Sequence, residues 1–138
     1  VISAVLAGAP VGLPALTPAV KLQNRAARVG FDWPDKAPVL DKIKEELQEL
    51  EDEITTNSSE AIAEEFGDFL FVVANLARHL KLDPEQCLRA ANRKFERRFS
   101  AMEQILEAEN KALRDCDLAI MDEAWTAAKR QEKVGRQG

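Results

Sequence analysis

Residues 38–81 read PVLDKIKEELQELEDEITTNSSEAIAEEFGDFLFVVANLARHLK and contain two helical patterns joined by a polar turn. Apolar residues recur at helical spacing over residues 38–54 and again over residues 59–81. The segment between them, TTNSS at residues 55–59, is typical of a short turn. Two amphipathic helices joined by a short turn are typical of an antiparallel helical hairpin, so the sequence predicts one here.

The rest of the chain extends this hairpin with further helices. Thr17 and Pro18 predict an N-cap and first helical residue, and Gly30 predicts the end of that helix after about Val29. A fourth helix is predicted from Pro84 to about residue 113, and a last one over residues 117–133. No segment alternates with a period of two, so we expect no sheet. The predicted fold is all-α, an antiparallel bundle of four to five helices.

Length and composition restrict the class of protein. The 138 residues fit one domain, and 46% hydrophobic and 31% charged residues are ordinary for a globular protein. We expect residues 1–13 to be a linker or tail and residues 14–138 to form one catalytic helical domain. The chain begins with Val rather than Met, which favours a fragment or a processed product. The apolar start lacks a basic segment and is not interpreted as a signal peptide.

Charge and cysteine content bear on partners and location. The net charge of −5 argues against non-specific binding to nucleic acid. No run of about 18 apolar residues is present, so we expect no transmembrane helix. Cys87 and Cys116 lie far apart without metal-type spacing, which favours reduced thiols in a cytoplasmic protein.

Four carboxylates flank the predicted turn in matched positions. Glu46 and Glu49 lie 11 and 8 residues before Asn57, while Asp68 and Glu65 lie 11 and 8 residues after it. Each pair is spaced i, i+3 and therefore shares one helix face. In an antiparallel hairpin, the two pairs meet at the same height. Four acids at one level repel each other unless a cation lies between them, so the pattern predicts a divalent metal site.

Helical-wheel positions distinguish the acids from one another. Glu46 and Glu49 flank the apolar stripe of their helix, whereas Glu45 points nearly opposite to the core. Glu65 falls inside the apolar arc of the next helix, and Asp68 falls just outside its edge. A carboxylate against an apolar face must take up a proton or find a cation. The alternative is that these are ordinary solvated acids, and the residues alone leave it open.

The type of ligand restricts which metal ion the site can bind. An all-carboxylate site suits Mg²⁺, Mn²⁺ or Ca²⁺. We favour Mg²⁺ because it commonly binds protein carboxylates and substrate phosphates at the same time. Mn²⁺ is its expected substitute. Zinc favours histidine or cysteine ligands, and the only histidine, His79, is expected to be structural.

Cationic and aromatic side chains near the helical core are candidates for contacts to an anionic substrate. Arg98 falls within the apolar arc of the fourth helix and Lys94 at its edge. An inward arginine either pairs with an acid of the bundle or binds a phosphate. Trp125 and Lys129 form an i, i+4 pair on the last helix, where Trp125 is either core or a ligand contact. Lys42, one turn before Glu46, either offsets the acids or contacts a phosphate.

Three segments together resemble the MazG-type nucleoside triphosphate pyrophosphohydrolases. They are EELQE at residues 45–49, EFGD at residues 65–68 and NRKFERRF at residues 92–99. Glu-Glu-x-x-Glu followed by Glu-x-x-Asp is the hallmark of that family. The resemblance extends over about residues 13–131 and is greatest to the C-terminal, catalytic half of two-domain members.

The resemblance implies an all-α homodimer that hydrolyses nucleoside or deoxynucleoside triphosphates to the monophosphate and pyrophosphate with Mg²⁺. The implied catalytic and metal-binding residues are Glu46, Glu49, Glu65 and Asp68. The implied substrate-binding residues are Lys42, Lys94, Arg98, Trp125 and Lys129. Ala61 stands where some relatives carry lysine, which leaves base selectivity open.

Other functions remain open at this stage. A narrower dUTP or dCTP pyrophosphohydrolase is the main alternative to a broad enzyme that cleans the nucleotide pool. A non-catalytic helical dimerisation or nucleotide-sensing module is the other. The partners expected from the sequence are nucleoside triphosphates and a second copy of the chain, without nucleic acid or membrane.

Overall fold

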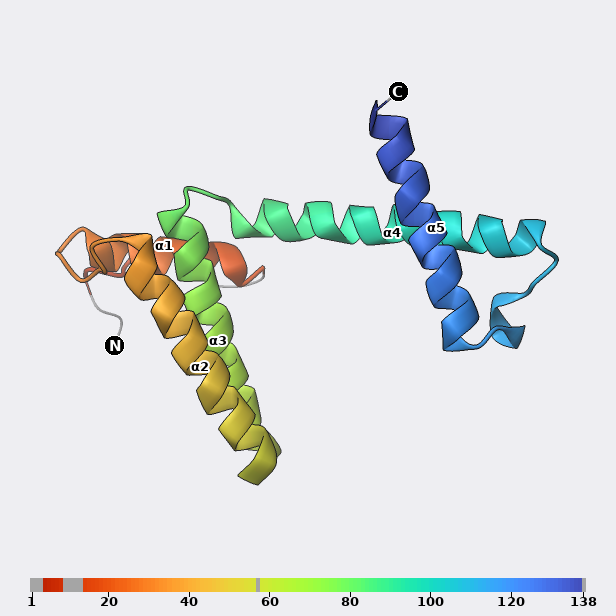
Figure 1. The fold of residues 1–138 in the computed structure, drawn as a ribbon. Helices are drawn as coiled ribbons and strands as arrows, with labels where there is room; N and C mark the ends of the chain where they lie inside the picture. Colours follow the sequence, from red (N-terminus) through yellow and green to blue (C-terminus); the bar gives the residue numbers. More distant parts are fainter. Residues whose placement is uncertain (1–3, 9–13, 57, 138) are drawn as a thin grey trace. The chain divides into compact units, whose positions relative to one another are not determined.

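The computed structural model describes residues 4–8, 14–56 and 58–137, with side chains up to residue 135. Within these residues the chain has five α-helices, one short 3-10 helix and no strand, which confirms the all-α prediction (Figure 1). The helices are α1 (Leu16–Ala27), α2 (Lys36–Thr56), α3 (Ser59–His79), α4 (Pro84–Ala108), η1 (Leu113–Asp115) and α5 (Leu118–Gln137). The chain divides into two compact units, residues 1–87 and 88–138.

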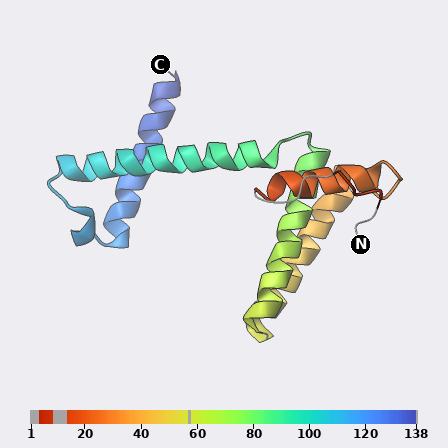
Figure 2. The same cartoon turned by 180° about the vertical axis from the view of Figure 1, so that it is seen from behind.

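In the first unit, α2 and α3 form the predicted antiparallel hairpin. The two helices lie side by side in both views of the ribbon, and α1 packs against α3 (Figures 1 and 2). The Ser58 hydroxyl accepts a hydrogen bond from the Ala61 amide and caps the start of α3. The predicted centre of the turn, Asn57, lies outside the described residues. The interior apolar side chains are Val39, Leu50, Val72 and Ala74.

The helix ends follow local backbone chemistry. The Phe31 amide donates to the Ala26 carbonyl and the Gly30 amide to the Ala27 carbonyl, which is the Schellman arrangement. Gly30 adopts φ +88°, so the prediction that Gly30 ends this helix is confirmed. The predicted N-cap at Thr17 is wrong, because α1 already begins at Leu16 and Ala15 before it makes no side-chain cap.

In the second unit, α4 and α5 pack through a small apolar core. Met102 and Leu106 of α4 are buried with Ala124 of α5, and Trp125 packs against them. The fourth helix ends at Ala108, five residues before the predicted end. The reason is Asn110, which adopts φ +60° and closes another Schellman arrangement.

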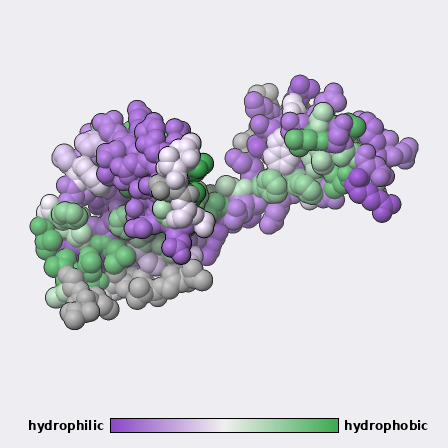
Figure 3. All heavy atoms as spheres, turned by 90° about the horizontal axis from the view of Figure 1, so that it is seen from below, coloured by the Kyte–Doolittle hydropathy of each residue, from purple (hydrophilic) through white to green (hydrophobic). Residues whose placement is uncertain are grey.

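The hairpin exposes part of the stripe that the sequence assigned to the core. The side chains concerned are large, apolar and more than one-third exposed: Leu40, Leu47, Ile54, Phe66 and Leu70. α1 packs against α3 and leaves these side chains uncovered, so they remain at the surface of the first unit. Figure 3 shows green apolar side chains at the surface of the body that α1, α2 and α3 form. This exposure is what a docking face requires, and the predicted dimer stays a prediction.

Two further expectations concern membrane and redox chemistry. Among the helices that the structure describes, none combines the length and apolar character needed to cross a bilayer. Cys87 and Cys116 are both free thiols, as expected. The predicted division into a tail over residues 1–13 and a domain over residues 14–138 stays a prediction.

Candidate metal centre

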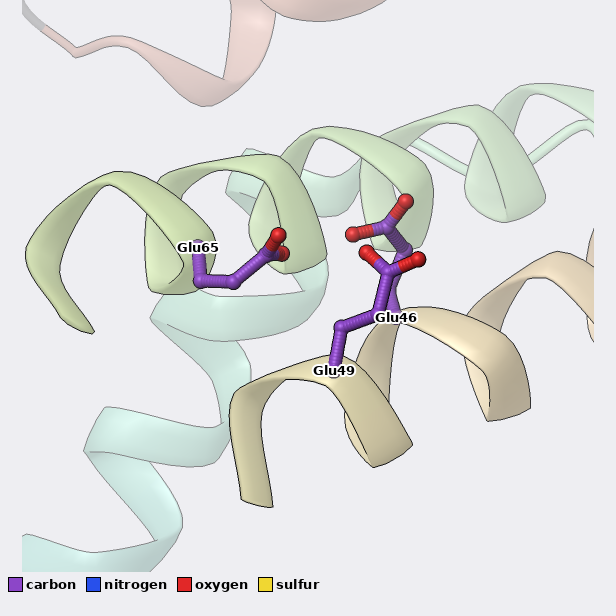
Figure 4. A group of neighbouring side chains, drawn as sticks. All are labelled: Glu46, Glu49 and Glu65. Carbon is purple, nitrogen blue, oxygen red and sulfur yellow. The ribbon is translucent and has the colours of Figure 1, made fainter. Parts of the chain in front are cut away.

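Three carboxylates from facing helices converge in the hairpin. Glu46 and Glu49 project from α2, and Glu65 projects from α3 toward them (Figure 4). One carboxylate oxygen from each residue lies within 4.8 Å of the corresponding oxygens of the other two. We call these three residues the glutamate cluster. The spacing about the turn therefore places three of the four predicted acids together.

The glutamate cluster is partly withdrawn from water. Glu46 is 7% exposed, and its Oε2 atom is buried, as is Oε2 of Glu65. No group in the described part of the chain donates a hydrogen bond to either buried oxygen. Burying a carboxylate oxygen without a donor is unfavourable, because the water that solvated it is lost. The arrangement therefore needs a proton or a cation between the carboxylates.

One lysine offsets part of the negative charge. The Lys42 ammonium lies 3.2 Å from Glu46 Oε1 and 3.2 Å from Glu45 Oε1. Its hydrogen bonds to Glu45 and Glu46 raise the pKa of Lys42 above its ordinary value. This lysine reaches one oxygen of Glu46 and leaves the buried oxygen of Glu46 without a donor.

Glu65 responds most strongly to this environment. Burial, hydrogen bonding with Glu46 and repulsion from Glu46 and Glu49 raise the pKa of Glu65 to about 7. At neutral pH, Glu65 is therefore close to the point where a proton and a metal ion compete for it. A hydrogen bond between Glu65 and Glu46 requires a shared proton, since two ionised carboxylates have no donor.

The donor set fits a hard divalent cation. All three groups are carboxylates, which suit Mg²⁺, Mn²⁺ and Ca²⁺ rather than zinc or copper. The buried oxygens of Glu46 and Glu65 supply ligand atoms that lack another partner in the described chain. The structure thus shows an acidic cluster suited to a divalent metal, without identifying which one.

Asp68, the fourth predicted ligand, is not part of the glutamate cluster. It lies one turn further along α3, and its side chain is exposed. Glu45 is also exposed and pairs with Lys42, in line with its predicted solvated position. The wheel positions thus separated Glu45 from Glu46 correctly, whereas the role of Asp68 remains a prediction.

The other predicted site residues lie in the second unit. Arg98 Nε donates to Glu132 Oε2 at 2.8 Å, and the Phe95 and Trp125 rings lie 5.5 Å apart. Lys94 and Lys129 are exposed. For Arg98 and Trp125, the structure therefore displays the ion pair and the core packing that the sequence offered as alternatives to substrate contacts. Sequence reasoning did not identify Glu132, although its spacing of i+7 from Trp125 places both on one side of α5.

A second charged group in the first unit also escaped the sequence analysis. Asp32 contacts both the Arg78 guanidinium and His79, whose Nε2 lies 3.0 Å from Asp32 Oδ1. Burial alone raises the pKa of Asp32, but hydrogen bonds and charge from Arg78 and His79 outweigh it and lower that pKa. We call these three residues the salt cluster. The contact with Asp32 gives His79 a structural role, as predicted. Asp32 lies 46 residues from Arg78 in the sequence, so no local spacing predicts the salt cluster.

Known proteins resemble this chain over the region that holds the glutamate cluster. Residues 36–102 match the model of the MazG nucleotide pyrophosphohydrolase domain. The chain is similar to a nucleoside triphosphate pyrophosphohydrolase of Escherichia coli (strain K12), with 45% identity over 129 residues. It is also similar to a nucleoside triphosphate pyrophosphohydrolase/pyrophosphatase MazG of Thermotoga maritima, with 44% identity over 117 residues.

The alignments cover most of this chain but only about half of each of these two relatives. The first alignment takes in 89% of this chain and 48% of the Escherichia coli protein, and the second 85% and 45%. An uncharacterized protein YabN of Bacillus subtilis is 45% identical over 69 residues, or 50% of this chain and 14% of that protein. The chain spans about half the length of the first two curated relatives. Residues 36–102 therefore carry a MazG nucleotide pyrophosphohydrolase domain.

Proposed function

We propose that this chain hydrolyses nucleoside or deoxynucleoside triphosphates to the monophosphate and pyrophosphate, with Mg²⁺ as its metal and Mn²⁺ as a substitute. The observation that carries the proposal is the glutamate cluster, with two buried oxygens that lack a donor in the described chain. The cluster falls inside the region that matches the MazG domain. The names of the relatives supply the substrate class.

The chain's own residues account for metal binding and proton handling. Glu46, Glu49 and Glu65 are the proposed ligands, with the exposed Asp68, one turn further along α3, proposed as the fourth. A bound divalent metal neutralises phosphate charge and lowers the pKa of a bound water. Because the pKa of Glu65 is about 7, binding at neutral pH displaces a proton from part of the population. Either Glu49 or Glu45 is proposed to accept the proton of the attacking water.

The substrate contacts are proposed on the residues that the family resemblance implies. They are Lys42, Lys94, Arg98, Trp125 and Lys129. The exposed ammonium groups of Lys94 and Lys129 are accessible to an anion. Arg98 uses its Nε atom for Glu132, so its two terminal nitrogens retain donors for a phosphate. Lys42 is already paired with Glu45 and Glu46, and a metal in the cluster would release it toward phosphate.

We also propose that the chain functions as a homodimer. The exposed stripe of the hairpin, which includes Leu47, Ile54 and Phe66, supports a docking face. Introducing Leu47→Glu on this stripe is expected to yield monomers, measured by light scattering during size-exclusion chromatography. A wild-type protein that is monomeric at all concentrations would contradict the proposal.

A cytoplasmic location without a nucleic-acid partner is proposed as well. Two free cysteines and a net charge of −5 support it.

The direct test is pyrophosphate release from dATP, GTP and dUTP, with and without Mg²⁺. Release that requires Mg²⁺ and occurs with all three nucleotides supports the broad enzyme. Strong preference for one base favours the narrower dUTP or dCTP enzyme instead. Nucleotide binding without release favours a sensing module, and the absence of both binding and release rejects the enzyme proposal.

A further inference from the structure

The first unit contains a cavity that is chemically unlike the glutamate cluster. It has a volume of about 620 Å³ and lies where α1, the segment after it and the second half of α3 meet. Three aromatic side chains line it: Phe31, Trp33 and Phe71. This volume lies in the range of small-molecule sites, which are mainly apolar with a few well-placed polar groups.

Two buried amide side chains also line the cavity. Asn75 is 2% exposed and Gln23 is 9% exposed. The Gln23 amide nitrogen donates to the carbonyl oxygens of Ala19 at 3.1 Å and Phe71 at 3.3 Å. Asn75 Oδ1 accepts a hydrogen bond from Arg78 Nε at 3.0 Å. These bonds fix which end of each amide is oxygen and which is nitrogen.

Each amide retains one unused hydrogen-bonding group. No described residue donates to Gln23 Oε1, and none accepts from Asn75 Nδ2. The cavity therefore offers one acceptor and one donor beside aromatic rings. Amide side chains of this kind recognise the donor and acceptor edges of nucleobases. Both groups are therefore available to a ligand that carries the complementary donor and acceptor.

The charge balance at the cavity excludes an anion as the preferred occupant. Arg78 lines the cavity, but its guanidinium is already engaged by Asp32 and by Asn75. A phosphate group would have to displace Asp32 to reach this cation. Phe31, in contrast, is 81% exposed, so its ring is available for stacking.

We propose that this cavity binds an uncharged planar heteroaromatic ring of the nucleobase type. The aromatic walls stack on the ring faces, and Gln23 and Asn75 pair with its edge. The ring is either the base of the triphosphate substrate or that of a separate nucleoside. The first case rests on the proposed function, whereas the second is independent of it.

The test uses nucleosides, which carry the base without phosphates. Adenosine, guanosine, cytidine, uridine and thymidine are titrated separately, without metal, into the full chain carrying Trp125→Phe. The fluorescence then reports Trp33, the remaining tryptophan. At least one nucleoside is expected to change the fluorescence with saturation, while ribose is expected to leave it unchanged.

Variants connect the signal to the cavity. Phe31→Ala and Asn75→Leu are each expected to weaken nucleoside binding about tenfold, by loss of stacking and of a hydrogen bond. Val29→Ala truncates another exposed apolar side chain of the same unit, one that does not line the cavity, and is expected to have no effect. If Asn75→Leu does not fold, the exposed Phe31 position still supplies the test. No saturable change with any nucleoside, or a change unaffected by Phe31→Ala, overturns the proposal.

Steady-state kinetics separate the two sources of the ring. If the ring is the substrate's own base, the nucleoside competes with the triphosphate, and Phe31→Ala raises KM with kcat unchanged. If the ring belongs to a separate nucleoside, binding occurs without competition. Glu65→Gln is expected to abolish hydrolysis but leave nucleoside binding intact. Failure of the cavity proposal is therefore distinguishable from failure of the proposed enzymatic function.

Discussion

The salt cluster and the glutamate cluster lie in the same unit and balance charge in opposite ways. In the salt cluster, one acid contacts two basic side chains, and the pKa of Asp32 is lowered. In the glutamate cluster, three acids converge, the Lys42 ammonium pairs with Glu46 alone among them, and the pKa of Glu65 is raised to about 7. The first cluster is satisfied by the chain itself. The second is complete only with an added proton or cation, which makes it the candidate functional site.

Charges that stabilise the fold and charges that await a ligand differ in where their partners lie. Structural ion pairs stabilise the fold and keep their partners within the protein. A functional cluster keeps unfavourable charges together because a ligand later compensates them. Substitutions that alter one cluster at a time test this distinction.

Glu65→Gln is expected to lower kcat for triphosphate hydrolysis at least about 100-fold. The estimate is conservative, because losing only an outer partner of a metal ligand costs about 10–100-fold. The same variant should raise the thermal midpoint of the metal-free protein at pH 8, since it removes a repelling charge. Pyrophosphate release and thermal denaturation measure the two effects. The matched control is Glu64→Gln, which changes the exposed neighbouring acid and should alter neither quantity.

Asp32→Asn breaks the satisfied cluster and should have the opposite pattern. It leaves the mostly buried Arg78 and His79 side chains without their carboxylate partner. We expect a loss of about 1–3 kcal/mol in the free energy of unfolding, with metal affinity unchanged. Denaturant titration measures the first and calorimetric titration with Mn²⁺ the second. If metal affinity falls as much as stability, the two clusters are not independent.

The two clusters also predict opposite responses to pH. The folded pKa of Glu65 exceeds its ordinary value of 4.5, so its contribution to stability is complete below pH 4.5 and lost as pH rises through about 7. The folded pKa of Asp32 lies below its ordinary value of 3.8, so its contribution is present above pH 3.8 and lost as pH falls through the folded pKa. Thermal midpoints of the metal-free protein from pH 3 to pH 8 test both directions.

Below pH 7, a proton on Glu65 competes with the metal. Metal affinity should therefore fall by up to about tenfold for each pH unit below the pKa of Glu65. Calorimetric titrations with Mn²⁺ between pH 5.5 and pH 8 measure this slope. An affinity independent of pH over that range would show that the metal does not displace this proton.

The smallest predicted effect concerns Lys81, a residue outside both clusters. Lys81 adopts φ +60° after α3, a conformation that disfavours lysine and suits glycine. Lys81→Gly is expected to raise the free energy of unfolding by about 0.5–1 kcal/mol and to leave the response to metal unchanged. Denaturant titration measures the gain. Destabilisation would mean that the lysine side chain makes a favourable contact that outweighs the backbone strain.

Much of the fold could be predicted from the sequence because its signals are local. Helical spacing identified α2 and α3, and Gly30 ended α1 as expected. The early end of α4 was missed, because asparagine in the left-handed conformation is a weaker sequence signal than glycine. The exposed position of Leu47 was missed as well. A wheel shows which face is apolar, but it does not show whether another helix covers that face.

The candidate site likewise has parts that local sequence signals predicted and parts that they did not. The hairpin spacing brought Glu46, Glu49 and Glu65 together because each helix and the turn between them are local structures. The salt cluster and the cavity were not predicted from the sequence. Both depend on how α1 and the segment after it lie against α3, which the sequence pattern does not specify.

The most direct test of the account is calorimetric titration of the full chain with Mg²⁺ at pH 7.5. Wild-type protein, Glu64→Gln and Asp32→Asn are expected to bind the ion with similar affinity. Glu65→Gln is expected to lose at least about tenfold in affinity, because one of three converging carboxylates is replaced by a neutral amide. Equal Mg²⁺ affinity in wild type and Glu65→Gln would contradict the claim that the glutamate cluster is the metal centre.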